Sequence, residues 1–356
     1  MMGRQPTYHG DPVTLDIRPL DPYRADQETL DGYHLMRAAA WAADFPEDPP
    51  MTREAAVGRL RTPPVHEGPG RTWTGHLGGR LAGSARVSLP EAPNEGIAWV
   101  EVHVHPELRR RGFGTELLRS VLPAVLESGR GTVFGLPMKP DAAAASWVAG
   151  LGFDVTHSTV MQLLRTTEVP ARGWEVPVPD GYRLVQWTGP TPEELVESYA
   201  LARRAVNDAP QGRTSYRAPR WTADQIRTED REVAEAGIEP WVAVAVEEAT
   251  GQVAGMHVVH HYQHRPAHAF VQDTAVLAAH RGRGLGRAVK AGLMRQLLAR
   301  RPDLELVFTT TAATNTHMID INHALGYRTA RTMNWVEIPT ARLVERLAQP
   351  LDERSS

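Results

Sequence analysis

Two short loops rich in arginine and glycine have the residue types best suited to binding an anion. The first, RRRGFG, spans Arg109 to Gly114, and the second, HRGRGLG, spans His280 to Gly286. Both contain the pattern Arg-x-x-Gly-x-Gly, which begins at Arg109 in one loop and at Arg281 in the other. These segments are too flexible for the interior of a helix and too basic for a hydrophobic core.

A glycine loop that enters a helix can bind a phosphate group. The first amides of a helix have no partner within it and point outward, and the helix dipole adds partial positive charge there. Glycine removes the β-carbon that would hold a pyrophosphate away from these amides, and arginine adds a forked cationic donor. The spacing therefore predicts two phosphate-binding loops, with a surface turn of solvated arginines as the alternative.

Two other phosphate-loop designs do not fit. A Walker loop needs Gly-Lys-Ser or Gly-Lys-Thr, which neither loop has. A dinucleotide-binding fingerprint needs G-x-G-x-x-G near the start of a βαβ unit. The second loop instead reads G-x-G-x-G, at Gly282, Gly284 and Gly286.

A second pair of matching segments indicates an internal duplication. GLGFDV at 150–155 resembles ALGYRT at 324–329, and nearly the same length of chain separates these segments as separates the two glycine loops. We therefore predict two related domains, residues 1–165 and residues 181–356. The proline-rich residues 166–180 form the predicted linker.

The two halves show the same order of predicted elements. Each has a short strand (13–20 and 181–187), two helices, a hairpin turning near 78–79 or 250–251, and a strand that runs into the glycine loop. A helix, a strand, a second helix and a last strand follow. This β-α-α-β-β-β-α-β-α-β order predicts an α/β fold with a mixed sheet of the α+β type.

Composition and charge exclude several classes of protein. The 356 residues are 42% hydrophobic and 23% charged, as in ordinary globular proteins. Because the chain has neither a long apolar run nor the apolar stretch of a signal peptide, we expect no membrane association and a cytoplasmic location. The absence of cysteine excludes disulfides and thiolate metal sites. A net charge of −3 argues against a general nucleic-acid binder.

The repeated motifs resemble the GNAT superfamily of acyl-CoA-dependent N-acetyltransferases. The resemblance rests on VHPELRRRGFG with GLGF in the first half, and on VLAAHRGRGLG with NTHMIDINHALGY in the second. It covers nearly the whole chain as two tandem GNAT folds, a layout similar to that of mycothiol synthase. It implies acetyl-CoA as cosubstrate and an amine as acceptor.

The resemblance also implies where the coenzyme lies. The loop amides would bind the pyrophosphate, and the pantetheine arm would pair like an added strand beside the strand that ends at Val104 or Val276. Asn315 stands where the family often has a coenzyme-contacting asparagine, whereas the first half has Asp141, whose carboxylate would repel an anion. The implied coenzyme-binding residues are Val104, Arg109, Arg110, Arg111, Gly112, Phe113, Gly114 and Thr115 in the first half, and Val276, Arg281, Gly282, Arg283, Gly284, Leu285, Gly286, Arg287 and Asn315 in the second.

In this family a neutral amine attacks the thioester directly. The ammonium must first lose a proton, a backbone amide near Val276 stabilises the oxyanion, and an acid assists the thiolate, whose pKa of about 8.5 makes it a fair leaving group. The usual position of the acidic tyrosine holds Val148 in the first half and Asn322 in the second. Asn322 could donate a hydrogen bond to sulfur, and a polar role on the helix surface is the alternative.

The base is the least defined group. Asp273 and Glu101 occupy equivalent positions in the strands that enter the two loops, but the usual base position of the family holds Phe270 and Ala98. Side chains alternate along a strand, so Asp273 reaches the acceptor only if a β-bulge re-aims it. Asp273 is therefore a candidate base or substrate anchor, with a structural hydrogen-bonding role as the alternative.

Five histidines crowd the second hairpin. A solvated loop is the simplest interpretation, and a metal site or a proton acceptor for the amine are alternatives. We assign no metal. The histidines are His257, His260, His261, His264 and His268.

These patterns predict an N-acetyltransferase whose second half is the working domain, because it has Asn315 and Asn322 where the first half has Asp141 and Val148. The acceptor is a small-molecule amine, and neither its identity nor the oligomeric state can be read from a motif. A mycothiol synthase-like enzyme acting on a sugar-cysteine amine is one alternative, weakened by Phe270 at the glutamate position of that family. A non-catalytic acyl-CoA-binding protein is the other.

Overall fold

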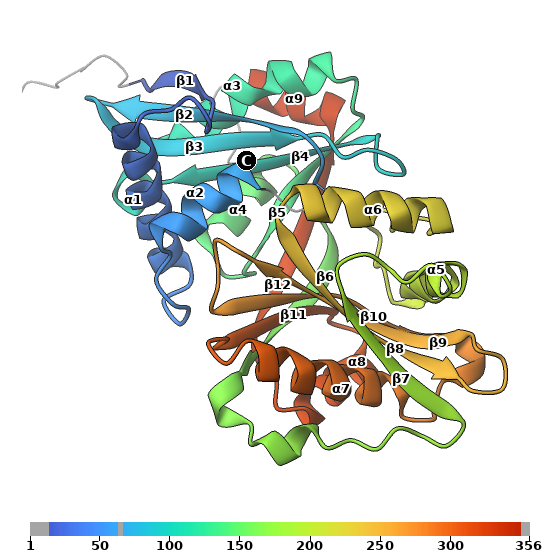
Figure 1. Ribbon diagram of the computed structural model, residues 1–356. Helices are drawn as coiled ribbons and strands as arrows, with labels where there is room; N and C mark the ends of the chain where they lie inside the picture. Colours follow the sequence, from blue (N-terminus) through green and yellow to red (C-terminus); the bar gives the residue numbers. More distant parts are fainter. Residues whose placement is uncertain (1–13, 63–66, 350–356) are drawn as a thin grey trace, which may run out of the picture.

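The strands form one continuous sheet that holds together two similar lobes (Figure 1). The structure is a computed structural model and describes residues 14–62 and 67–349. Within these residues the sheet has 12 strands in the order β1-β2-β3-β4-β5-β12-β6-β11-β10-β9-β8-β7. We call the part from β1 to β5 with α1–α4 the N-lobe, and the part from β7 to β11 with α5–α8 the C-lobe. Strands β6 and β12 lie between them.

The predicted order of elements is confirmed in both halves. The first half contains β1 (Asp16–Leu20), α1 (Gln27–Asp44), α2 (Arg53–Arg61), β2 (Gly70–Leu77), β3 (Arg80–Ser88), β4 (Ile97–Val104), α3 (Phe113–Glu127), β5 (Thr132–Met138), α4 (Ala143–Gly150) and β6 (Asp154–Arg165). The second contains β7 (Tyr182–Thr188), α5 (Val196–Arg204), α6 (Ala223–Glu235), β8 (Ile238–Glu247), β9 (Val253–Tyr262), β10 (His268–Val276), α7 (Leu285–Arg300), β11 (Leu306–Ala312), α8 (Thr316–Ala324), β12 (Arg328–Pro339) and α9 (Thr340–Ala348).

The last strands of the two halves are exchanged. Strand β6 pairs with β11 of the C-lobe, while β12 pairs with β5 of the N-lobe, and β6 and β12 pair with each other. Helix α9 follows β12 and buries Leu343 and Leu347 in the N-lobe core. The division at residues 166–180 stays a prediction about units of sequence, because the end of each unit lies in the sheet beside the other.

The proline-rich connection is packed against the protein rather than loose. It forms two short 3₁₀ turns, Thr166–Glu168 and Ala171–Trp174. Trp174 is only 1% exposed and belongs to the C-lobe core with Trp241 and Leu293. This burial gives the segment a structural role besides joining the halves.

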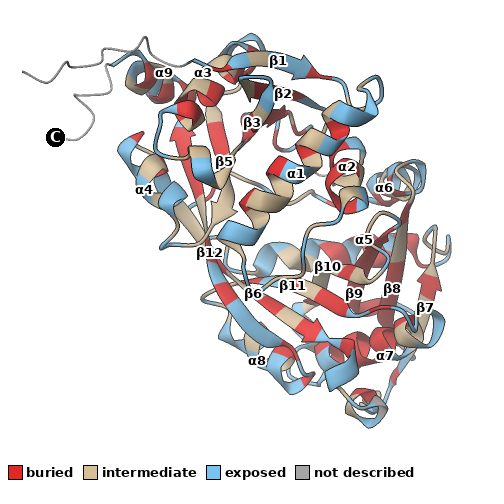
Figure 2. Ribbon diagram, turned by 90° about the vertical axis from the view of Figure 1, so that its left-hand side faces the viewer, coloured by how far each residue is buried: buried red, intermediate tan, exposed pale blue. Residues whose placement is uncertain are grey.

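Helices cover both faces of the sheet, and the buried residues form separate cores on each face (Figure 2). In the N-lobe, alternate residues of β4, including Ala98 and Val100, face α3, while Trp99 belongs to a cluster on the other face. In the C-lobe, Ala269 faces α7 and Ala275 faces α5 and α6. Each lobe therefore has a face for the glycine-loop helix and a face for the first two helices.

The strands before and after each glycine-loop helix pair over only part of their length. Strands β4 and β5 pair from Ile97 to Val100, although β4 continues to Val104. Strands β10 and β11 pair from His268 to Phe270, although β10 continues to Val276. We call the unpaired continuation of each strand pair its wedge. Its free backbone edge is where an extended ligand can add as a strand.

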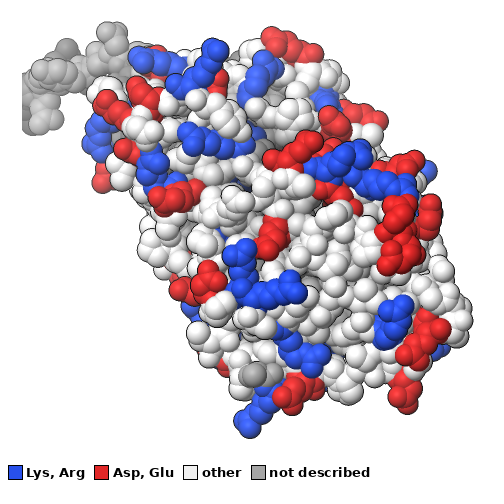
Figure 3. All heavy atoms as spheres, in the orientation of Figure 1, with Lys and Arg blue, Asp and Glu red and all other residues white. Residues whose placement is uncertain are grey.

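Charges of both signs are interspersed on the face shown in Figure 3. Arg227 of α6, for example, forms ion pairs with Glu193 and Asp224. Among the described residues, no helix has the length and hydropathy to cross a bilayer.

Candidate active site

The two glycine loops have the same backbone shape. In the C-lobe, Gly282 and Gly284 have φ angles of 76° and 83°, and Gly284 is the N-cap of α7. In the N-lobe, Arg110 and Gly112 have φ angles of 65° and 84° at the equivalent positions. Arg110 thus adopts a left-handed conformation that glycine adopts without strain. The N-lobe reaches the same loop at a higher conformational cost.

The loop of each lobe fits the pyrophosphate of acetyl-CoA. Neither α3 nor α7 has a side-chain cap, so the first-turn amides are left for another partner. A β-carbon built on Gly112, Gly282 or Gly284 would meet no atom within 4 Å, so the space beside the amides is open. Open space beside uncapped amides at the positive end of a helix is what a pyrophosphate requires. We call this arrangement the cradle.

The first arginine of each loop braces the loop from behind. The Nε of Arg281 donates to the carbonyl oxygen of Val276 at 3.0 Å, and its guanidinium pairs with Asp208. Arg109 repeats both contacts, with the carbonyl of Val104 at 3.1 Å and Asp44 at 2.6 Å. Both side chains therefore turn back toward the strand end. Their predicted contact with the coenzyme stays a prediction.

The other predicted coenzyme-binding residues differ in what they can offer. Phe113 and Leu285 are buried, so only their backbone amides are available. The hydroxyl of Thr115 accepts a hydrogen bond from the indole of Trp147 at 3.1 Å. Arg283 donates to the hydroxyl of Tyr182 at 3.0 Å. The remaining side chains, those of Arg110, Arg111 and Arg287, are exposed.

Asn315 serves as the N-cap of α8 in this structure. Its Oδ1 accepts from the amide of Met318 at 3.2 Å. In the N-lobe the N-cap of α4 is Ala142, which makes no such bond, and Asp141 is exposed. The two lobes therefore differ in the helix that follows the wedge as well as in the predicted ligand residue.

A bulge in β10 turns Asp273 toward α5 and α6. The pairing with β9 shifts between Val271 and Asp273, so Gln272 has no partner in the register. The carboxylate of Asp273 lies 2.8 Å from the guanidinium of Arg203 on α5, and its side chain is 20% exposed. The bulge on which a role for Asp273 depended is present.

Arg203 links two carboxylates on this face. Its side chain is 4% exposed and pairs with Glu229 at 2.7 Å as well as with Asp273. Its guanidinium stacks on the ring of Trp221 with the carbon 3.9 Å from the ring centre. Burial raises the pKa of Glu229 above its ordinary value, and burial together with the charge of Asp273 raises the pKa of Tyr216 to about 12. One guanidinium is therefore shared by two carboxylates on this face.

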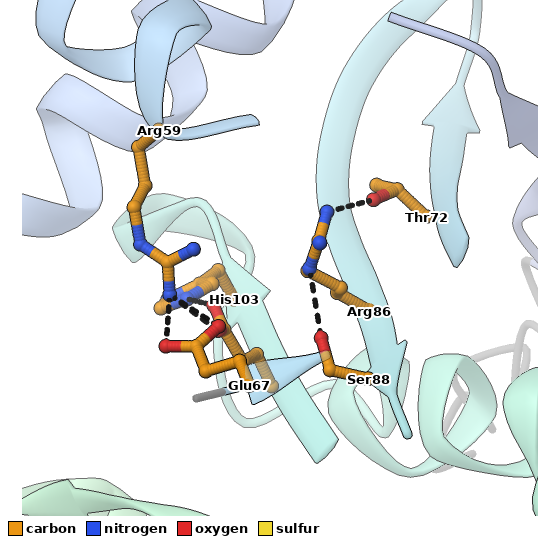
Figure 4. A network of polar contacts seen from close by, with 7 residues as sticks. Arg59, Glu67, Thr72, Arg86, Ser88 and His103 are labelled. Carbon is orange, nitrogen blue, oxygen red and sulfur yellow. Dashed lines mark hydrogen bonds and ion pairs between the residues drawn. The ribbon is translucent and has the colours of Figure 1, made fainter. Parts of the chain in front are cut away.

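In the N-lobe the equivalent carboxylate, that of Glu101, is less exposed, and Figure 4 shows two of its partners, Arg59 and His103. Arg59 of α2 lies 2.7 Å from Glu67 and 3.1 Å from Glu101, whose side chain is 11% exposed. Although burial opposes it, the charges of Arg59 and of nearby His103 hold the pKa of Glu101 well below its usual range. Burial and the charge of Arg37 lower the pKa of His103 to about 4.

Arg203 was not predicted from the sequence, although a repeated pattern marks it. Tyr-x-Leu-x-Arg occurs at Tyr33 to Arg37 in α1 and at Tyr199 to Arg203 in α5. Arg203 donates toward the hydroxyl of Tyr199 at 3.4 Å. Comparing the first helices of the two halves would have found this pair of arginines.

Asn322 lies in the interior rather than on a helix surface. It is 0% exposed, and its Nδ2 donates to Oε1 of Gln162 on the exchanged strand β6 at 2.7 Å. Its Oδ1 is buried without a hydrogen-bond partner. The alternative of a polar role on the helix surface is wrong, because α8 packs this residue against β6. Donation to sulfur stays a prediction.

The solvated-loop interpretation is wrong for three of the five hairpin histidines. His257, His260 and His261 lie in β9 and are at most 8% exposed. The described residues contain no group of three or more His, Cys, Asp or Glu that could hold a metal ion. His257 contacts β10 beside Asp273, with Nδ1 3.2 Å from the carbonyl oxygen of that residue.

Comparison with known proteins agrees with this geometry. The model of the "Acetyltransferase (GNAT) family" matches twice, at residues 35–153 and 204–327. The chain belongs to the GNAT acetyltransferase family. As a GNAT enzyme it is an acetyl-CoA-dependent N-acetyltransferase that transfers the acetyl group to an amine.

Several known proteins resemble most of the chain. The mycothiol acetyltransferase of Salinispora tropica is 30% identical over 82% of this chain and 88% of its own. That of Nocardia farcinica is 30% identical over 86% and 93%. The solved structure of a tandem GNAT protein from the clavulanic acid biosynthesis pathway has a TM-score of 0.74 at 27% identity, covering 92% of this chain and 98% of that one. The tandem GNAT fold predicted from the motifs is confirmed.

Proposed function

We propose that the C-lobe is the working acetyltransferase site and that it acetylates a small-molecule amine bound beside Asp273. The observation that carries this proposal is the bulge at Gln272, which turns Asp273 toward the face of α5 and α6, where Asp273 and Glu229 share the single guanidinium of Arg203. An alkyl amine reaches the site mostly as an ammonium, since its pKa is about 10. The carboxylate of Asp273 would attract that ammonium and take its proton.

The parts around Asp273 support direct attack on a thioester held in the wedge. In this proposal the uncapped amides of Leu285 and Gly286 hold the pyrophosphate, and the free edge of β10 pairs with the pantetheine arm. The bulged residue Gln272, outside the strand register, is the candidate for donating an amide hydrogen to the oxyanion. Acetyl-CoA supplies the activated acetyl group.

The N-lobe has the supporting role in this proposal. The side chain of Glu101 is 11% exposed against 20% for Asp273, and β4 pairs with β3 without a shift of register along its length. The N-lobe keeps the cradle, so it can bind the coenzyme without carrying out the transfer. The cytoplasmic location, the boundaries at 1–165 and 181–356, and the coenzyme-binding roles of the individual side chains stay predictions.

Matched substitutions at the two N-caps test which lobe works. Gly284→Asp and Gly112→Asp place a carboxylate in open space at equivalent cradles, and aspartate tolerates the left-handed backbone better than most residues. We expect Gly284→Asp to lower kcat/KM for acetyl-CoA more than tenfold, with Gly284→Asn milder because it is neutral. Gly112→Asp should leave turnover unchanged.

The assay combines thiol release with calorimetry. A panel of amino sugars, polyamines and amino acids with acetyl-CoA identifies an acceptor by the appearance of free thiol, and calorimetric titration counts the acetyl-CoA sites in each variant. Undiminished turnover in Gly284→Asp would overturn the assignment to the C-lobe. Loss in Gly112→Asp alone would transfer it to the N-lobe.

A second acceptor class follows from the relatives. Two of them are named mycothiol acetyltransferases and match most of the chain. This favours a sugar-linked cysteine amine as one member of the panel. Phe270, which stacks on Phe308 with ring centres 5.3 Å apart, replaces the glutamate expected of that family. Preferred turnover of the sugar-linked amine would decide for this class.

A further inference from the structure

Lysine is almost absent from this chain, yet one of its two lysines is buried in the C-lobe. Lys139 and Lys290 are the only lysines among 39 basic residues. Lys290 lies on α7 and is 1% exposed. Arginine stays charged at all ordinary pH values, whereas lysine can lose its proton when buried. This buried position therefore has the type of basic residue that can release its proton.

Lys290 is part of a small polar cluster between α7 and the sheet. Its Nζ lies 3.4 Å from Oγ1 of Thr274, and the same oxygen lies 2.8 Å from Nδ1 of His257. The ammonium also stands over the ring of Tyr327, 5.4 Å from its centre, which favours the charged form. Oγ1 of Thr274 therefore lies within hydrogen-bonding distance of two nitrogens.

One tautomer of His257 satisfies both contacts of its Nδ1. The carbonyl oxygen of Asp273, 3.2 Å away, can only accept, so with the hydrogen on Nδ1 that hydrogen is shared between this oxygen and Oγ1 of Thr274. Both His257 and Lys290 then donate toward Oγ1 of Thr274 and occupy its two lone pairs. The hydroxyl hydrogen of Thr274 is left to donate to a further partner.

That further partner lies in the direction of the wedge. Thr274 follows Asp273 on the part of β10 that no longer pairs with β11, and it is partly exposed. Its side chain points to the α7 side, opposite to that of Asp273. A thioester held in the wedge would therefore have Asp273 on one side and Thr274 on the other.

The fold does not require this cluster, because the N-lobe replaces every member with an apolar residue. Thr274 pairs with His257 in the C-lobe register, and Val102 pairs with Ala85 in the N-lobe register. The glycine-loop helix and the residue just before the last strand show the same replacement. In full, His257, Thr274, Lys290 and Tyr327 correspond to Ala85, Val102, Leu118 and Phe153.

We propose that Lys290 is a positioning residue that delivers a proton through the Thr274 hydroxyl to the departing coenzyme A sulfur. This inference rests on the proposed function of the C-lobe. It supplies an acid where the usual tyrosine position holds Asn322.

The step balances in atoms and charge. The amine nitrogen forms a bond to the thioester carbon, and the carbon–sulfur bond breaks with its electron pair going to sulfur. Sulfur takes the Thr274 hydroxyl proton while Thr274 takes one from the Lys290 ammonium. The proton lost by the amine nitrogen leaves through Asp273 to solvent on the other face. Lys290 regains a proton from water once the products have left the wedge.

The electrostatic surroundings agree with a proton that is easily given up. Burial lowers the pKa of Lys290 to about 7. The groups that face it are His257 from β9, Thr274 from β10 and Tyr327 before β12. Burial and the charge of Lys290 hold the pKa of His257 well below its ordinary value, so His257 is neutral.

The kinetic test replaces the cluster with the residues of the N-lobe. Lys290→Leu and Thr274→Val should each lower kcat about tenfold, a modest loss because a thiolate with a pKa near 8.5 leaves fairly well unaided. Wild-type kcat should fall as pH rises above the pKa of Lys290, and both variants should lose that falling limb. Thr274→Ser, which keeps the hydroxyl, should retain it. An unchanged profile in Thr274→Val would overturn the proposal.

A spectroscopic test does not depend on turnover. Protein labelled with ¹³C-lysine gives two ε-carbon signals, and Lys139→Arg assigns them. The Lys290 signal should titrate near pH 7 in the free enzyme and at higher pH with coenzyme A bound, because a thiolate nearby favours the ammonium. A midpoint near that of an ordinary lysine, about 10, in the free enzyme would overturn the proposal.

Stability and binding separate this inference from the proposed function. Lys290→Leu should be at least as stable as wild type, since it removes a buried amine, and should bind acetyl-CoA with unchanged stoichiometry. If Lys290→Leu unfolds, Thr274→Val alone decides. Failure of the proposed function appears instead as turnover that survives Gly284→Asp, whatever the lysine signal does.

Discussion

The two lobes share a backbone and differ in the side chains around the wedge. Both have a cradle with left-handed residues at the same positions and an arginine that donates to the end of the preceding strand. Only the C-lobe has a bulge before the wedge, a carboxylate left 20% exposed and a buried lysine beneath it. Phosphate binding depends mainly on backbone amides, so a duplicated domain can keep it while its side chains drift. The chemistry depends on a few side chains that a single substitution removes.

The exchanged strand β12 also ties each lobe to the other. Glu337 accepts from the hydroxyl of Thr214 at 2.6 Å and from the amide of Ser215 at 3.1 Å, so it anchors the connection between α5 and α6. Arg331 lies 2.7 Å from Glu47 and also pairs with Asp48, in the connection between α1 and α2. Strand β12 therefore anchors the connection between the first two helices in both lobes. This gives the N-lobe a structural role that does not depend on catalysis.

The largest expected difference between the lobes is the stability lost on replacing Arg203 in α5 or its equivalent in α1, Arg37. Arg203→Ala leaves Glu229 and Asp273 without their shared cation, and we expect a loss of about 3–5 kcal/mol in the free energy of unfolding. Arg37→Ala should cost about 1 kcal/mol, because Arg59 still neutralises Glu101. Denaturant unfolding of both variants measures the difference.

The control for this contrast keeps the charge and changes the geometry. Arg203→Lys restores one cation without the planar fork, so it should recover part of the loss. Equal destabilisation by Arg203→Ala and Arg37→Ala would contradict the view that the C-lobe concentrates its buried charge on one arginine.

The sequence was sufficient for the fold of each half and for the cradles. Glycine positions, strand–helix order and the repeated Leu-Gly-aromatic segment all report local backbone geometry, which neighbouring residues determine. The exchange of β6 and β12 could not be predicted, because either strand has the same pattern whichever lobe it joins. The bulge at Gln272 depends on a register with β9, and the pairing of Arg203 with Asp273 joins residues far apart in the chain. The sequence of α7 does not distinguish buried Lys290 from an exposed helix lysine, because its neighbours Thr274 and Tyr327 come from other parts of the chain.

A pH-dependent contrast comes next in size. The pKa of His103, lowered to about 4 by burial and by Arg37, lies below the ordinary value of about 6.5, so the unfolded chain binds its proton first. Its contribution to stability is therefore intact above about pH 6.5 and is lost as the pH falls toward 4. The loss amounts to about 1–3 kcal/mol.

The variant His103→Ala tests how steeply the free energy of unfolding falls with pH. Alanine is the residue that the C-lobe has at the equivalent position, Ala275. Unfolding experiments from pH 7 to 4 should show a shallower decline for the variant. Glu101 does not interfere, because its pKa is lowered and its contribution is lost only below its ordinary pKa of about 4.3. Parallel slopes for wild type and variant would contradict a lowered pKa of His103 in the folded protein.

The smallest contrast concerns the one backbone difference between the cradles. Arg110 in the N-lobe has a φ of 65° where the C-lobe has Gly282 at 76°. A left-handed non-glycine residue costs about 1–2 kcal/mol, part of which is offset because glycine gives the unfolded chain more freedom. Arg110→Gly should therefore stabilise the protein by about 0.5 kcal/mol, and Gly282→Arg should destabilise it by a similar amount.

The substitution Gly282→Arg also tests whether the N-lobe, which has an arginine at this position, can bind the coenzyme. The N-lobe loop reaches the same shape with an arginine, and a β-carbon on Gly282 meets nothing within 4 Å. Gly282→Arg should therefore keep calorimetric acetyl-CoA binding and turnover within about threefold of wild type, since the amides that hold the phosphate do not move. Loss of binding as severe as in Gly284→Asp would mean that an arginine here closes the cradle. The N-lobe, which has that arginine, would then be unable to bind the coenzyme at all.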